Sequence, residues 1–88
     1  MITKIIKDSL RENLKGLGIN VLTDQISLER PANRDHGDWS SNIALVTAKD
    51  AGRQARGLAE EIVNLLTTNL PDGITEVTAA GPGFINFR

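Results

Sequence analysis

The N-terminal residues carry apolar side chains at the spacing of an amphipathic helix. Steps of mainly three and four residues place these side chains on one helical face; they are Ile2, Ile5, Ile6, Leu10 and Leu14. Gly16 and Gly18 follow, and glycines at this point are typical helix stops. The pattern therefore predicts a helix over residues 2–15.

The next segment alternates between apolar and polar residues. Ile26 and Leu28 are separated by Ser27 and followed by Glu29, which is the period of two of a half-buried strand. Pro31 has no backbone N–H and restricts the residue before it, so the strand should end there.

Two more helices are predicted in the middle of the chain. Asp38 can accept hydrogen bonds from the free amides of a first helical turn, so we interpret it as a structural cap and begin a helix there. Its expected apolar face consists of Trp39, Ile43 and Val46, with Leu45 on the flank. Gly52 closes this helix, and a third should run from about Gln54 to Leu70. The expected apolar face of the third helix consists of Leu58, Ile62, Leu65 and Leu66.

The C-terminal part reads as two strands, 74–80 and 83–88, joined by the sequence Gly-Pro-Gly. The full order is helix, strand, helix, helix, strand, strand. We therefore predict the α+β class, with a small, mainly antiparallel sheet and about three helices packed on one face. The last strand is still alternating at Arg88, so we expect a domain cut from a longer chain.

Composition narrows the possible classes of protein. The chain has 88 residues, enough for one domain with a modest core, and the absence of cysteine excludes a disulfide scaffold and a thiolate metal site. Charge at Lys4 comes too early for a signal peptide, and no apolar run approaches the roughly 20 residues that span a bilayer. We expect a cytoplasmic location with no membrane contact. The net charge of −1 argues mildly against a free-standing nucleic-acid binder.

The last strand carries the most informative candidate site. If Ile85 and Phe87 fill the core, alternation places Phe84, Asn86 and Arg88 together on the other face of the sheet. A ring can stack on an unpaired base, an amide can pair with a base edge, and an arginine can meet a phosphate. The alternative is that Phe84 also belongs to the core, because a chain with one Trp and two Phe needs its rings for packing.

Two further features point weakly toward RNA. Gly81 and Gly83 would let a partner's backbone approach the turn closely. Basic residues also recur on one face of the first helix, where they could follow a phosphate backbone or form an ordinary solvated surface; these are Lys4, Lys7, Arg11 and Lys15.

Evidence for catalysis is poor. His36 lies between Asp35 and Asp38, which could form a weak acid–base cluster, but no nucleophile accompanies them. The chain has neither a second histidine nor a cysteine to complete a zinc site. The residues themselves thus indicate a non-catalytic module with no metal or cofactor of its own.

Three segments resemble the N-terminal domain of arginyl-tRNA synthetases. Residues 80–87, AGPGFINF, closely resemble the signature that closes that domain, and residues 36–44, HGDWSSNIA, look like its Gly-Asp-aromatic-x-x-Asn-x-Ala segment. Residues 56–62, RGLAEEI, are similar to the family's Pro-Arg-x-Ile/Leu-Ala-x-x-Ile helix. Ala55 departs from the family, which commonly has proline there, so we expect a slightly different helix start and no change of function.

The resemblance implies that residues 1–88 are a single tRNA-binding domain in front of a class I catalytic domain. Phe84 and Asn86 take the positions that contact a base of the D-loop, at the elbow of arginine-specific tRNA. The parent would be an arginine–tRNA ligase using ATP and magnesium, and we expect it to be a monomer. This segment lacks the HIGH-type and KMSKS-type motifs, so it should be non-catalytic alone. The alternative is a protein- or domain-interaction module.

Overall fold

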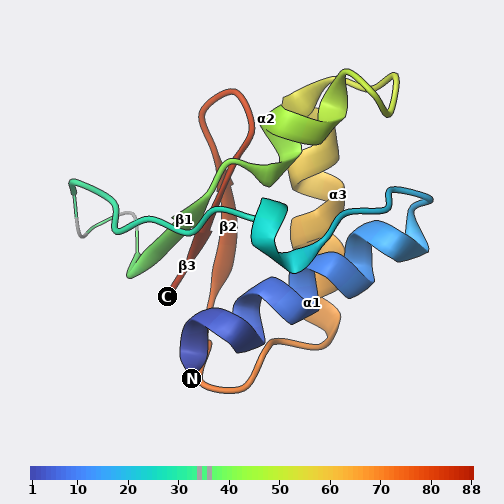
Figure 1. Cartoon of the computed structure of the whole chain (residues 1–88). Coiled ribbons are helices and arrows are strands. Elements are labelled where there is room, and N and C mark those ends of the chain that lie inside the picture. Colours follow the sequence, from blue (N-terminus) through green and yellow to red (C-terminus); the bar gives the residue numbers. More distant parts are fainter. Residues whose placement is uncertain (34, 36) are drawn as a thin grey trace.

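The computed structural model describes residues 1–33, 35 and 37–88. Its elements are the α-helices α1 (Ile2–Gly16), α2 (Ile43–Ala48) and α3 (Ala55–Thr68), the 3-10 helix η1 (Thr23–Gln25), and the strands β1 (Trp39–Ser41), β2 (Val77–Ala80) and β3 (Phe84–Phe87) (Figure 1). The predicted α+β class is confirmed.

The C-terminal strand β3 is the centre of the sheet. The strand order is β1-β3-β2, and β3 is antiparallel to both neighbours. The register pairs Asn86 with Ser40 on one side and Thr78 on the other, while Phe87 pairs with Trp39 and Val77. Since cross-strand partners share a face, this register decides which side chains stand together.

The helices pack on one face of the sheet, as predicted. Helices α2 and α3 contact β3, and α1 packs against α3 (Figure 1). Ile85 and Phe87 point into this layer and are both 0% exposed. The apolar face of α1 joins the same core through Ile6, Leu10 and Leu14. The pattern of residues 2–15 therefore predicted the helix and three of its buried residues, but Ile5, also expected on the apolar face, is 36% exposed.

The predicted helix start at Asp38 is wrong, and Asp38 is not a helix cap. Its N–H donates to the Phe87 carbonyl oxygen (2.8 Å), and the next three residues form β1. Helix α2 begins only at Ile43, whose N–H donates to Ser41 Oγ (3.2 Å). Pairing with the distant strand β3 thus prevails over a local capping signal.

The buried faces of the two later helices also differ from the prediction. Val46 was expected in the core but is 58% exposed, because α2 begins later and turns a different face inward, consisting of Ile43, Ala44, Thr47 and Ala48. In α3, Leu65 is 39% exposed, whereas Leu58, Ile62 and Leu66 are buried as predicted.

The strand predicted around Ile26–Glu29, before Pro31, is reduced to one antiparallel bridge. The backbones of Glu29 and Ser40 exchange two hydrogen bonds of 2.9 and 2.8 Å, and the unpredicted helix η1 precedes this segment. The alternation itself is confirmed, since Ile26 is buried and Ser27 and Glu29 are exposed. The segment thus extends the sheet at the edge of β1 by a single residue pair.

Candidate nucleic-acid interface

The candidate interface is the face of the sheet opposite the helices. A row of polar residues crosses this face through cross-strand pairing: Glu29, Ser40, Asn86 and Thr78. Phe84 lies two residues before Asn86 on the same strand and therefore on the same face. The three α-helices gather on the other side in Figure 1, so none of them covers this row.

Phe84 is open to solvent. The residue is 39% exposed and lines a groove of about 500 Å³, together with Asn86, Ser40, residues 29–32 and residues 80–82. This volume is within the roughly 300–1,000 Å³ common for small-ligand sites. The alternative that Phe84 belongs to the core is therefore wrong.

Asn86 is less open than the alternation suggested. It is only 7% exposed, because it occupies the central strand between Ser40 and Thr78. Its side-chain amide makes no hydrogen bond to any described residue. Asn86 nevertheless lines the groove, and a side-chain amide can both donate and accept hydrogen bonds.

The two turn glycines have different neighbours. Gly81 has a φ of +55°, and a Cβ there would lie 3.5 Å from Phe84 Cδ2, so the ring rests beside this residue. Gly83 is buried, and a Cβ there would lie 2.9 Å from Ala55 Cβ and 3.0 Å from Leu45 Cγ. The space beside Gly83 is filled by α2 and α3, which corrects the expectation that this glycine makes room for a partner.

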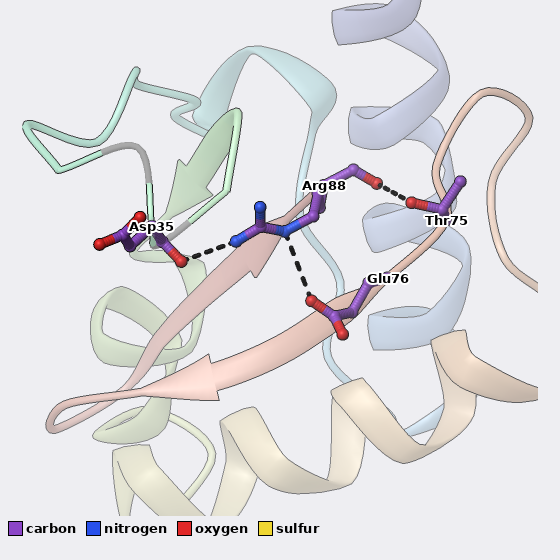
Figure 2. Close-up of polar contacts among 4 residues, drawn as sticks. All are labelled: Asp35, Thr75, Glu76 and Arg88. Carbon is purple, nitrogen blue, oxygen red and sulfur yellow. Dashed lines mark hydrogen bonds and ion pairs between the residues drawn. The ribbon is translucent and has the colours of Figure 1, made fainter.

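Arg88 is held by its own domain, as Figure 2 shows. Its Nη2 donates to the Asp35 carbonyl oxygen (2.7 Å), and its Nε lies 3.5 Å from Glu76 Oε1. The Arg88 carbonyl oxygen also accepts a hydrogen bond from Thr75 Oγ1 (3.1 Å). The guanidinium is thus already engaged, and Arg88 does not line the groove beside Phe84.

The basic residues of α1 form a separate surface. Lys4, Lys7 and Arg11 line a shallow hollow together with Asp8 and Asp24, and this hollow shares no residue with the groove at Phe84. Lys4 Nζ also lies 2.8 Å from Asp8 Oδ2. The structure therefore does not bring these residues to the candidate site, and their contact with RNA stays a prediction.

Comparison with known proteins places the chain in a family. The protein-family model described as the arginyl tRNA synthetase N-terminal domain matches residues 4–88. The chain belongs to this family. An arginine–tRNA ligase of Paenarthrobacter aurescens (strain TC1) is 42% identical over 85 residues, which cover 97% of this chain and 15% of that protein. An arginine–tRNA ligase of Bifidobacterium longum (strain DJO10A) is 51% identical over 63 residues, 72% of this chain and 10% of that protein.

The fold of this synthetase domain is shared with a solved structure. Thermus thermophilus arginyl-tRNA synthetase superposes with a TM-score of 0.82 at 23% identity, over 100% of this chain and 14% of that one. At this identity the match shows a common fold. The chain spans 15% or less of the length of these relatives.

Sequence reasoning missed Arg30 in this synthetase domain. Its guanidinium carbon lies 4.3 Å from the centroid of the Trp39 ring, a cation–π contact, and Arg30 also lines the groove at Phe84. The only signal is indirect: antiparallel pairing of Glu29 with Ser40 brings Arg30 beside Trp39. That pairing is not visible in any local pattern.

The aspartate and glutamate side chains of the described residues form no cluster of three or more that could hold a metal ion. No helix in the described ranges is long and apolar enough to cross a membrane. The hypothetical acid–base cluster involves His36, which lies outside the described residues.

Proposed function

We propose that this domain binds an unpaired nucleotide in the D-loop of arginine-specific tRNA, at the tRNA elbow. The observation that carries the proposal is the exposure of Phe84, which is 39% exposed and lines a groove together with Asn86. Aromatic rings stack on splayed bases, and amides pair with base edges. Family membership supports tRNA as the partner.

The rest of the proposed activity belongs to a longer protein. Relatives named arginine–tRNA ligase are several times longer than this chain, which supports a parent in which a class I catalytic domain follows residue 88. We propose that this parent acts as a monomer in the cytoplasm, joining arginine to its tRNA with ATP and magnesium. Both cofactors would bind in the catalytic domain.

The net charge of the domain suggests which contacts with tRNA it makes and which are made by the rest of the enzyme. Phosphate contacts supply much of the affinity of proteins for nucleic acids, and this chain has a net charge of −1. We therefore assign local recognition of one nucleotide to the domain, and most of the phosphate contacts to the rest of the enzyme.

The decisive experiment is Phe84→Ala in the full-length enzyme. We expect tRNA binding to weaken by about 1–3 kcal/mol, the usual contribution of one base stack, measured as the tRNA Kd. Leu65→Ala is a matched control, because Leu65 is also 39% exposed but lies on α3 and does not line the groove.

Two results would count against the proposal. Unchanged tRNA affinity in the Phe84 variant would remove the stacking role. If that variant instead destabilised the full-length enzyme with tRNA binding intact, the Phe84 face would be a docking surface for another domain. Nuclease footprinting of tRNA with and without residues 1–88 gives an independent check, with D-loop protection expected only when they are present.

A further inference from the structure

The beginning of α3 holds the turn that carries Phe84. Arg56 Nη1 donates a hydrogen bond to the Gly81 carbonyl oxygen (2.8 Å), across 25 positions in the sequence. Ala55, the first residue of the same helix, packs closely against Gly83. Two consecutive residues of α3 thus fix two points of one short turn.

We propose that Arg56 is a positioning residue, which fixes the Phe84 ring for its nucleotide by holding the Gly81 carbonyl. This inference rests on the proposed function and assigns a role to a residue outside the groove. Arg56 is not among the residues that line the groove, so its effect must pass through the turn.

The turn needs such an attachment. Gly81 and Pro82 are exposed, and the β2–β3 ladder ends at the pair Ala80 and Phe84. Gly83 is packed against α2 and α3, but a glycine at position 81 allows many backbone conformations, so without the Arg56 hydrogen bond Gly81 would sample several of them. Because the Phe84 ring lies beside Gly81, movement of Gly81 would remove the support of the ring.

The surroundings of Arg56 favour positioning over a direct phosphate contact. Its Nε lies 3.7 Å from Glu60 Oε1, so a carboxylate stands beside the same guanidinium that binds the Gly81 carbonyl. That carboxylate would also repel an approaching phosphate. The side chain is about half exposed, so its removal should leave the core intact.

The test uses the full-length synthetase with Arg56→Ala, and Arg53→Ala as the matched control. Arg53 lies just before α3 and pairs with Glu61, so this variant removes the same charge without touching the turn. We expect Arg56→Ala to weaken tRNA binding about 3–10-fold, the usual worth of one hydrogen bond, and Arg53→Ala to leave the Kd unchanged. Arg56→Lys, which retains a donor and the charge, should restore part of the loss.

Two further measurements separate positioning from a direct contact with RNA. The dependence of log Kd on log salt concentration should keep its slope in Arg56→Ala, whereas loss of a phosphate contact would reduce the slope by about one. In the Phe84→Ala background, Arg56→Ala should cause no additional loss. Hydrogen exchange at the amides of residues 83 and 84 should be faster in Arg56→Ala than in Arg53→Ala, without any RNA present.

Failure of the proposed function and failure of the positioning role of Arg56 would give different results. If Phe84→Ala leaves tRNA binding unchanged, the proposed function fails, and the positioning role fails with it. If Phe84→Ala weakens binding but Arg56→Ala does not, only the positioning role is overturned. Equal losses in the Arg53 and Arg56 variants, a reduced salt slope, or additive losses with Phe84→Ala would also overturn it.

Discussion

The two ends of β3 differ in how much of the strand's outer face is available. At the first end, Phe84 is exposed beside a groove, and its cross-strand partner is the small residue Ala80. At the other end, the guanidinium of Arg88 is held by Glu76 and by the Asp35 carbonyl oxygen (Figure 2). Both side chains were expected on one face and both suit RNA. The comparison shows that alternation assigns a face, whereas the neighbouring strand and loops decide whether a side chain on that face can bind anything.

The largest effect on stability is expected beside Phe87, at the end of β3 that leads into Arg88. Gly37 has a φ of +106°, and a Cβ there would lie 2.6 Å from the Phe87 carbonyl oxygen. Gly37→Ala should therefore lower the free energy of unfolding by roughly 2–5 kcal/mol, through backbone strain and a clash, as measured by urea unfolding.

Gly52→Ala is the matched control for this variant. Gly52 also has a positive φ, +66°, but a Cβ there would meet nothing within 4 Å. Its loss should be only about 1–2 kcal/mol, from the left-handed backbone alone. Equal losses at Gly37 and Gly52 would show that the close approach to β3 contributes nothing.

A smaller effect is expected for Arg88→Ala. It removes one hydrogen bond to the Asp35 carbonyl oxygen and an exposed ion pair with Glu76, so stability should fall by about 0.5–1.5 kcal/mol. The salt dependence of tRNA binding by the full-length enzyme should not change. The contradicting result is unaltered stability together with a slope of log Kd against log salt concentration that falls by about one. Arg88 would then contact a phosphate, and the two ends of β3 would not differ in their availability to RNA.

The smallest expected effect is a gain in stability at Ala55, which packs against Gly83 next to Phe84. Ala55 is the first residue of α3, and Gln54 before it has φ −74° and ψ 135°, a conformation that suits the residue before proline. Ala55→Pro should therefore raise the free energy of unfolding by about 0.4–1 kcal/mol by restricting the unfolded chain, with tRNA affinity unchanged. A lower melting temperature would instead mean that the contact with Gly83 leaves no room for the proline ring.

Local patterns predicted which face of an element is buried, because this information repeats within the element itself. The spacing in residues 2–15 specified α1 and the burial of Ile6, Leu10 and Leu14, because the apolar residues of an amphipathic helix mark the side that packs on the core. Alternation in residues 84–87 likewise placed Ile85 and Phe87 in the core and Phe84 on the other face. The prediction failed at Asp38, where a residue type common at helix starts instead precedes a strand.

By itself, the sequence determined the α+β class, the orientation of β3 and the resemblance to arginyl-tRNA synthetases. Only the tertiary structure decided that residues 39–41 form a strand, that Asn86 lines a groove, and which arginines are already engaged. The physical reason is the distance along the chain over which these contacts act. Arg56 reaches the Gly81 carbonyl across 25 positions, and Arg88 reaches the Asp35 carbonyl across 53. Periodicity describes the neighbours of a residue within one element and contains no information about such partners.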